Sequence, residues 1–379
     1  GLGIDIIDLG LSTTPTVEFM VPKLSADGGI IITASHNPKQ WNALKLLNIK
    51  GEFISAKDGI RGTIGGKSGD ALTPIDIAKF SLAFGTILKL KDAKKIVVGR
   101  DARISGEMVH HIVVGNLLGI GLDVIDLGLA TTPTVEMAVV AENADGGIII
   151  TASHNPKQWN ALKLLNSKGE FISEKVGQDV LKRANSGKFE FVEVDKLGVV
   201  AHKDYLDYHI EEILKITAVN VDAIKAKKLK VVVDAVNSVG GIAVPKLLKA
   251  LGVEQIHELY CEPTGKFAHN PEPLPEHLSM LCAEVKQQKA HIGIAVDPDV
   301  DRLAFVDEQG IPFGEEYTLV AVADYILTHK KGNTVSNLSS TKALRDISKK
   351  HGVEYFTSAV GEVNVVEKMK EVNAVIGGE

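Results

Sequence analysis

Three aspartates alternate along one short segment of the chain, Asp297, Asp299 and Asp301. Carboxylates this close raise one another's pKa, so they remain ionised together only beside a cation. A hard divalent ion such as Mg²⁺ takes oxygen ligands and leaves positions open for a phosphate oxygen. Apolar runs that are typical of strands flank the segment, at 291–296 and 303–306. The pattern therefore predicts a Mg²⁺-binding loop at the end of a strand.

Two other interpretations fit the same acidic residues. The segment is also compatible with a solvated acidic turn that Arg302 neutralises in part. The spacing Asp-x-Asp-x-Asp further resembles a calcium-binding loop, with Glu308 at its twelfth position. That loop needs glycine at its sixth position and flanking helices, whereas Arg302 stands there between two strands. The calcium interpretation is rejected on these grounds.

A second chemical segment is Thr-Ala-Ser-His-Asn-Pro at 151–156, directly after the apolar run 147–150. A serine at the end of a buried strand lies where loops and backbone N–H groups converge on anionic ligands in α/β folds. Ser153 is therefore a candidate nucleophile for phosphoryl transfer, with the aspartates and their metal balancing the phosphate charge. A serine that only shapes a turn or caps a helix is the alternative.

Basic residues at strand ends and in glycine-rich loops extend this set. Arg61 lies in the glycine-dense segment 59–66, and Arg100 follows the predicted strand 95–99. Lys163 is a candidate base or electrophile if neighbouring cations depress its pKa, and an exposed helix lysine otherwise. His154 is either catalytic or a neighbour that shapes the loop.

The serine segment occurs twice. Residues 26–48 are identical to residues 144–166, which places a second copy of the serine at Ser35. We expect Ser153 to be the functional copy because basic segments precede it and the acidic loop follows it. Ser35 is expected to be non-functional, and the leading copy indicates a spliced or engineered chain more than a natural repeat.

Strands alternate with helices along the chain, which predicts crossover units and a mainly parallel sheet. The expected fold class is α/β, with several consecutive α/β domains of mixed, mainly parallel sheets around a central cleft. Residues 1–58 show strand, helix, strand, serine loop and helix, which is half of a domain. Residues 188–203 are polar and irregular and are expected to form a linker.

Composition narrows the protein class. The chain has 379 residues, 45% of them hydrophobic, and a formal net charge of -6 without a Lys/Arg-rich block, so no nucleic-acid partner is indicated. The two cysteines form neither a disulfide framework nor a metal motif, and a reducing cytoplasm is the simplest compartment. Nothing in the sequence resembles a membrane span or a signal peptide. The sequence does not indicate an oligomeric state.

Together these motifs resemble the α-D-phosphohexomutases, which include phosphoglucomutase, phosphomannomutase and phosphoglucosamine mutase. The resemblance covers 59–379 and rests on Gly-Ile-Arg-Gly, Gly-Arg-Asp-x-Arg, the serine hexapeptide, the acidic loop and the final Gly-Gly-Glu. It implies an isomerase that interconverts hexose 1-phosphates and 6-phosphates through a phosphoserine and a hexose 1,6-bisphosphate. It further implies site residues in three groups: Ser153, Lys163, Arg61 and His154 for catalysis; Ser153, Asp297, Asp299 and Asp301 for Mg²⁺; and Arg302, Arg100, Glu362 and Glu379 for substrate.

The resemblance also implies a domain plan, with residues 1–58 as a duplicated second half of domain I. Domain I with the phosphoserine is expected at 59–198, domain II with the metal loop at 199–311, and an incomplete domain III at 312–379. Domain IV is expected to be absent, which would leave the chain weakly active or inactive. Pro298 and Glu362 depart from the usual family letters, so the preferred sugar stays open.

Two alternatives to a mutase remain at this point. One is a non-catalytic or engineered fragment that binds sugar phosphate. The other is a phosphatase with an aspartate nucleophile in the acidic loop, and the late position of Asp297 argues against it.

Overall fold

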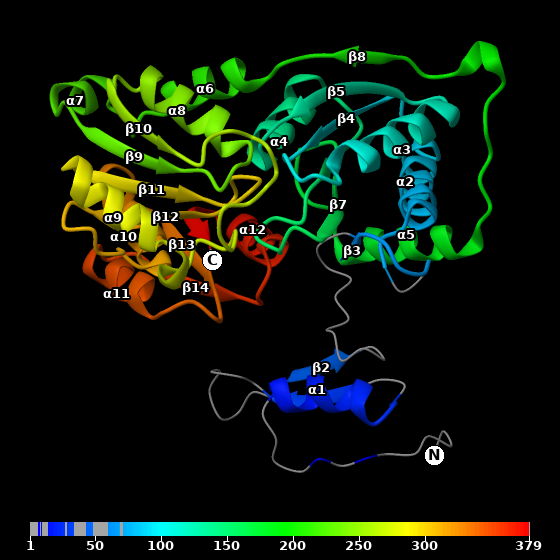
Figure 1. Cartoon of the computed structure of the whole chain (residues 1–379), viewed down its shortest axis with the longest axis horizontal. Coiled ribbons are helices and arrows are strands. Elements are labelled where there is room, and N and C mark those ends of the chain that lie inside the picture. The colour runs from blue at the N-terminus through cyan, green and yellow to red at the C-terminus, as the bar shows by residue number, and fades with distance from the viewer. Residues whose placement is uncertain are drawn as a thin grey trace. The chain divides into compact units, whose positions relative to one another are not determined.

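A computed structural model of the chain describes residues 7, 9, 14–26, 29–33, 43–47, 60–68 and 71–378. The chain forms two compact units, residues 1–56 and 57–379 (Figure 1). Each unit is described by itself. None of the helices in these described ranges combines the length and the apolar composition needed to span a lipid bilayer.

In the first unit, the described residues form a helix and an antiparallel strand pair. Helix α1 (Thr14–Lys23) precedes strands β1 (Gly29–Thr33) and β2 (Ala43–Leu47), which pair with each other. The helix expected after this serine loop is therefore wrong, because a strand follows the loop. The predicted first strand and the predicted duplicate serine, Ser35, lie outside the described residues.

Domain I of the second unit is built on a six-stranded sheet in the order β3-β7-β6-β4-β5-β8. Strands β6, β4, β5 and β8 run parallel, whereas β7 pairs antiparallel with both β6 and β3. The strands are β3 (Ile60–Thr63), β4 (Lys95–Arg100), β5 (Asp123–Leu129), β6 (Gly147–Ile150), β7 (Trp159–Leu165) and β8 (Val200–His202).

Helices cover both faces of this sheet. Ile96 and Val98 pack in the cluster that contains α2, α3 and α5, whereas Val97 between them packs with α4. Successive strand residues point to opposite faces, so both faces are buried. Thr73 caps α2, with Pro74 as the first helical residue. The helices are α2 (Pro74–Lys89), α3 (Gly106–Gly119), α4 (Thr132–Ala141) and α5 (Glu174–Ser186).

Two expectations about domain I are wrong. Residues 159–165 form β7, so the helix considered for Lys163 is wrong. The segment mixes apolar residues with Asn160 and Lys163, a pattern compatible with a helix or with a strand buried on both faces. The expected linker 188–203 contains the short helix η1 (Val194–Lys196) and strand β8, which pairs with β5. Strand β8 thus extends the sheet of domain I a few residues past the expected boundary at 198.

Domain II is a four-stranded sheet in the order β10-β9-β11-β12, with the last pair antiparallel. Helices α8 and α9 pack in separate apolar clusters on this sheet. The strands are β9 (Lys230–Asp234), β10 (Gln255–Leu259), β11 (Ile292–Val296) and β12 (Leu303–Asp307). The helices are α6 (Leu206–Leu214), α7 (Val221–Ala226), α8 (Gly240–Ala250), η2 (Pro275–His277) and α9 (Ser279–Gln288).

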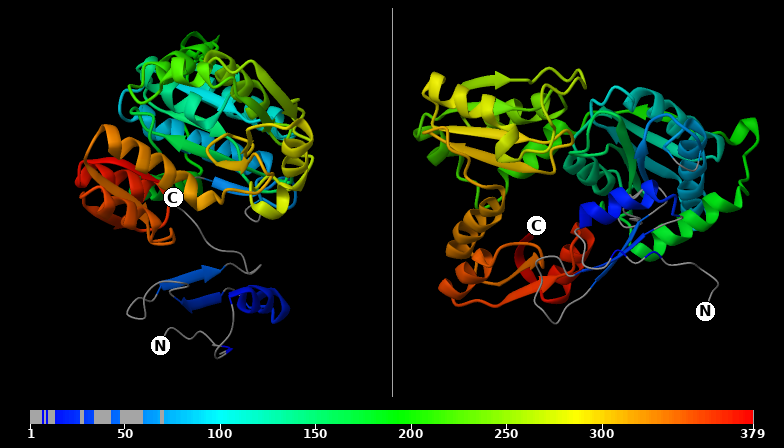
Figure 2. Two further views of the ribbon diagram at one scale, coloured as in Figure 1. Left: turned by 90° about the vertical axis from the view of Figure 1, so that its left-hand side faces the viewer. Right: turned by 60° about the horizontal axis from the view of Figure 1, so that its bottom comes forward.

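Domain III has a parallel three-stranded sheet in the order β14-β13-β15. In Figure 2, domain I of the second unit is coloured from blue through cyan to green, domain II from green to yellow, and domain III from yellow-orange to red. The elements are α10 (Glu315–His329), β13 (Asn333–Asn337), α11 (Ala343–Lys350), β14 (Tyr355–Ser358), α12 (Glu362–Glu371) and β15 (Ala374–Gly378).

Candidate active site

The structure brings Ser153 of domain I against the acidic loop of domain II. Ser153 follows β6, is 3% exposed and has a backbone φ of +50°. Its hydroxyl donates to Asp297 Oδ2 at 2.6 Å and lies 3.3 Å from Asp301 Oδ1. His154 Nδ1 lies 3.2 Å from the same hydroxyl. A serine and an acidic loop that are 144 residues apart in sequence therefore share one site.

The three aspartates lie between the antiparallel strands β11 and β12, as the sequence predicted. Asp297 and Asp299 are fully buried and Asp301 is exposed. The backbone N–H groups of Asp301 and Arg302 each donate to Asp297 Oδ1 at 3.1 Å, which ties the loop into a tight turn. One oxygen from each carboxylate lies within 4.8 Å of the others, close enough for one ion to bind all three.

One carboxylate oxygen in this loop lacks a partner. Asp299 Oδ1 is buried and, among the described residues, accepts no hydrogen bond. Leaving a buried charged acceptor unsatisfied costs roughly 1–3 kcal/mol or more. A cation would satisfy this oxygen, and carboxylates are the ligands that hard divalent ions prefer. The acidic loop therefore fits a metal ion on the geometry of its own side chains.

Charge interactions within the loop are strong and unequal. Burial raises the pKa of Asp297 well above its usual value, and the neighbouring carboxylates of Asp299 and Asp301 raise it further. Burial would also raise the pKa of Asp299, but the ammonium group of Lys163 outweighs it and lowers that pKa to about 2. Thr132 Oγ1 donates to Asp299 Oδ2 at 2.6 Å and supports the ionised form. Carboxylate charges this close within one loop repel each other, and a bound cation would relieve that repulsion.

Lys163 is a buried strand residue and not an exposed helix lysine. It lies on β7, is 6% exposed, and its ammonium group contacts Asp299 Oδ2 at 2.8 Å and Asp301 Oδ2 at 2.7 Å. Burial alone would lower the pKa of Lys163, but these two carboxylates outweigh it and raise the pKa. The condition under which Lys163 was a candidate base, a pKa depressed by neighbouring cations, is therefore not met. The arrangement keeps Lys163 as a cation bound to the acidic loop that Ser153 contacts.

Of the other predicted basic residues, Arg61 contacts the serine loop directly. Arg61 on β3 donates to Asn155 Oδ1 at 2.7 Å. Burial, together with the charges of Arg302 and Arg61, lowers the pKa of His154 to about 3, so this imidazole is neutral at pH 7. Arg100 at the end of β4 donates to the Asp101 carbonyl at 3.2 Å, and Arg302 binds Glu272 at 3.2 Å.

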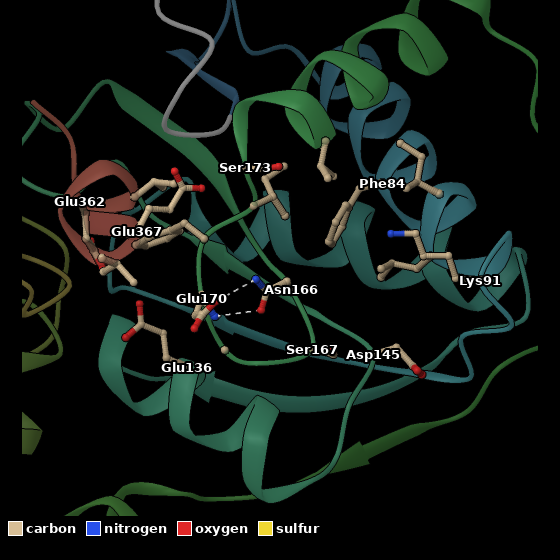
Figure 3. Close-up of a pocket in the computed structure, with 18 of the residues that line it drawn as sticks. Phe84, Lys91, Glu136, Asp145, Asn166, Ser167, Glu170, Ser173, Glu362 and Glu367 are labelled. Atoms are coloured by element: carbon tan, nitrogen blue, oxygen red, sulfur yellow. Dashed lines mark hydrogen bonds between the residues drawn. The ribbon is translucent and has the colours of Figure 1, made fainter. Parts of the chain in front are cut away.

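The predicted substrate residue Glu362 lies away from the serine hydroxyl, at the start of α12. It lines a cavity of about 590 Å³ together with Glu136 of α4 and residues of the segment after β7 (Figure 3). Lys370 of α12 forms an ion pair with Glu170 at the same cavity. Glu379 lies outside the described residues.

Glu136 and Thr132 contribute to this region, and the sequence analysis did not identify either. Both lie on α4, one turn apart, and Thr132 belongs to the Thr-Pro pair that begins the helix. Thr132 binds the acidic loop twice, because its N–H also donates to the Asp299 carbonyl at 2.9 Å. Burial, together with the neighbouring carboxylate of Glu362, raises the pKa of Glu136 to about 8. The Thr-Pro pair in the sequence indicated the start of a helix, but nothing in the sequence indicated that this helix start contacts domain II.

Replacing Glu136 with Gln is expected to stabilise the protein at pH 8 more than at pH 5. Between the usual pKa of 4.5 and the raised value of about 8, the unfolded chain loses this proton while the folded chain retains it. Wild-type stability from this group therefore falls as pH rises through that window, and glutamine removes the dependence. Thermal unfolding of E136Q at both pH values tests this, with exposed Glu190→Gln as the control. An equal shift in Tm at both pH values would contradict it.

Family models match the chain in three parts. The model of phosphoglucomutase/phosphomannomutase α/β/α domain I matches residues 1–58 and again residues 54–191. The models of domains II and III of the same family match residues 204–310 and 314–379. The chain belongs to the phosphoglucomutase/phosphomannomutase family. These matches confirm the resemblance to the α-D-phosphohexomutases and the expected α/β fold class.

Individual relatives of this family agree. A Thermococcus kodakarensis protein named phosphoglucomutase/phosphomannomutase is 37% identical over 324 residues, 84% of this chain and 70% of that protein. A Sulfurisphaera tokodaii phosphoglucosamine/phosphogalactosamine mutase is 32% identical over 328 residues, 85% of this chain and 70% of that protein. A crystal structure of a family protein from Burkholderia thailandensis has a TM-score of 0.74 at 30% identity and covers 86% of this chain and 70% of its own.

Proposed function

We propose that the chain acts as a Mg²⁺-dependent phosphohexomutase in which Ser153 carries the phosphoryl group. The supporting observation is the contact of the Ser153 hydroxyl with Asp297 at 2.6 Å, beside the orphaned oxygen of Asp299. The reaction interconverts hexose 1-phosphate and hexose 6-phosphate, with a hexose 1,6-bisphosphate as the intermediate. Within this family, the site supports an isomerase that works by phosphoryl transfer.

The acidic loop is the proposed Mg²⁺ site. Asp297, Asp299 and Asp301 would hold the ion, and a phosphate on Ser153 would supply a further oxygen. When bound, Mg²⁺ neutralises phosphate charge and polarises the phosphorus for attack. The fit rests on the donor set of three carboxylates and on the buried oxygen of Asp299 that lacks a partner among the described residues.

The remaining groups hold protons and charge in the transfer. The bond from phosphorus to the sugar oxygen breaks as the bond to Ser153 Oγ forms. The serine proton passes to Asp297, which already accepts it, and then to the leaving sugar oxygen. Lys163 and Arg61 provide fixed positive charge near the phosphoryl group, which stabilises negative charge that moves during transfer. Neutral His154 packs beside the hydroxyl without adding charge.

Substrate recognition is proposed for Arg100, Arg302, Glu362 and Glu379, by the family resemblance. Guanidinium groups suit planar, bidentate contact with phosphate. The named relatives act on different sugars, glucose and mannose phosphates in one name and amino-sugar phosphates in another. The preferred hexose phosphate is therefore a question for assays with glucose, mannose and glucosamine 1-phosphates in parallel.

Phosphate uptake tests the proposal directly. After incubation with glucose 1,6-bisphosphate and Mg²⁺, the intact mass of the chain is expected to rise by one phosphoryl group. The two serine copies separate on tryptic digestion, because Ser35 falls in the peptide 24–39 and Ser153 in the peptide 104–157. Phosphate on the longer peptide supports the proposal. No gain in mass, or phosphate elsewhere only, would refute it.

A further inference from the structure

Arg103 is a fully buried arginine that takes no part in the proposed chemistry. It follows β4 in the Gly-Arg-Asp-x-Arg motif and is 1% exposed. Its Nε donates to Asp101 Oδ2 at 3.0 Å, and Phe267 covers the guanidinium plane at 5.1 Å. Its other N–H groups donate to backbone carbonyls of the serine loop, namely those of Ser153, Asn155 (2.8 Å), Pro156 (3.0 Å) and Trp159 (3.1 Å).

A second chain of hydrogen bonds reaches the same serine from its other side. Asp101 is fully buried and accepts from Thr151 Oγ1 at 2.7 Å. The Thr151 hydroxyl in turn accepts from the backbone N–H of Ser153 at 2.9 Å. The N–H and the carbonyl of Ser153 are therefore both held, one through Thr151 and the other by Arg103. Asp101 joins the two routes.

These hydrogen bonds to the N–H and the carbonyl of Ser153 explain its unusual backbone conformation. A serine at a φ of +50° is in the left-handed region, which L residues leave unless their surroundings over-determine it. The fixed backbone directs the hydroxyl at Asp297. Burying an ion pair is weak evidence for added stability, because desolvation offsets the attraction. The N–H groups of Arg103 instead donate to several carbonyls of the serine segment, which indicates that the arginine fixes the geometry of that segment.

We propose that Asp101, Arg103 and Thr151 are positioning residues that hold the backbone of Ser153 so that its hydroxyl faces the acidic loop. The proposal rests on the proposed function of Ser153 and adds the groups that orient it. Loss of this hold would let the Ser153 peptide relax toward ordinary φ values and move the hydroxyl away from Asp297. A displacement of about 1 Å in a reacting group can cost roughly 100-fold in rate.

A matched pair of variants at Thr151 tests the inference. Thr151→Val keeps the shape of the side chain but removes the hydroxyl, whereas Thr151→Ser keeps the hydroxyl. The rate of phosphate transfer from glucose 1,6-bisphosphate to Ser153 at saturation is expected to fall ~10- to 100-fold in T151V. In T151S it is expected to stay within about threefold, because the hydrogen bond to the Ser153 N–H persists. The half-saturating bisphosphate concentration is expected to stay unchanged in both.

Arg103→Lys gives an independent comparison, since lysine keeps the charge but lacks the planar fork. We expect a slower transfer in R103K per folded molecule, and no change in the surface variant Arg345→Lys. If R103K does not fold, the Thr151 pair decides. Equal rates in T151V and wild type, or equal losses in T151V and T151S, would overturn the positioning role alone. If wild type takes up no phosphate on Ser153, the proposed function fails and the positioning role fails with it.

Discussion

Replacing Ser153 with Ala is expected to reduce phosphate uptake from glucose 1,6-bisphosphate by roughly a thousandfold or more, because no other group replaces an attacking nucleophile. The hydroxyl of Ser153 is buried and contacts Asp297 in the acidic loop, to which the ammonium group of Lys163 is also bound. Alanine removes the one atom to which phosphorus must bond. The fold is expected to survive, since alanine deletes only an oxygen whose main partner is an aspartate. The measurement is the time course of intact mass with bisphosphate and Mg²⁺.

The duplicated segment supplies a matched control for this experiment. Ser35→Ala makes the same change inside an identical stretch of 23 residues, so the two variants differ only in which copy they alter. S35A is expected to take up phosphate at the wild-type rate. If S35A loses uptake and S153A retains it, the first copy is the functional one, and the assignment of Ser153 is wrong.

Asp299→Asn is expected to abolish the response of the protein to Mg²⁺ with little change in the metal-free fold. The amide oxygen of asparagine can accept the hydrogen bonds that Thr132 and Lys163 now donate to Asp299 Oδ2. Its NH₂ group then occupies the position of the orphaned Oδ1, where it repels a cation. A ligand at a hundred times its Kd stabilises a folded protein by about 2.7 kcal/mol. Wild type should therefore gain several degrees in Tm with Mg²⁺, and D299N should gain none.

Activity provides a second measurement of the same change. Phosphate transfer to Ser153 is expected to fall by roughly 100-fold or more in D299N, and by a similar factor when EDTA removes metal from wild type. EDTA should not slow D299N further. Asp346→Asn, an exposed aspartate paired with Arg345, is the control and should keep the Mg²⁺ response. A D299N protein that is stabilised by Mg²⁺ as strongly as wild type would contradict the proposed metal site.

The sequence was sufficient to identify the two loops of the site. Ser153 and the aspartates of 297–301 each follow an apolar run that forms a buried strand, and their side-chain types indicate their chemistry. Such signals are local, because strand ends and turns are encoded by neighbouring residues.

The sequence was insufficient where the outcome depends on distant neighbours. Residues 159–165 mix apolar residues with Asn160 and Lys163, and only pairing with β6 and β3 decides that they form a strand. The pKa of Lys163 rises because carboxylates 136 and 138 residues away surround its ammonium group. The contact of Thr132 with Asp299 spans 167 residues in the same way. Propensity and spacing carry no information about such contacts, so these groups were missed or misjudged.

The two hairpins have a consequence for how the chain folds. Hairpin β1–β2 aligns Ile31 with Lys45, and hairpin β6–β7 aligns Ile149 with Lys163 in the identical register. During folding, the chain thus contains two hairpins with the same core sequence, and the sheet of domain I has one position for such a hairpin, next to β4. The sequences of the two hairpins do not distinguish them. Which one enters the sheet has to be decided by what is attached to their ends, the lengths of the flanking segments and the order in which they leave the ribosome.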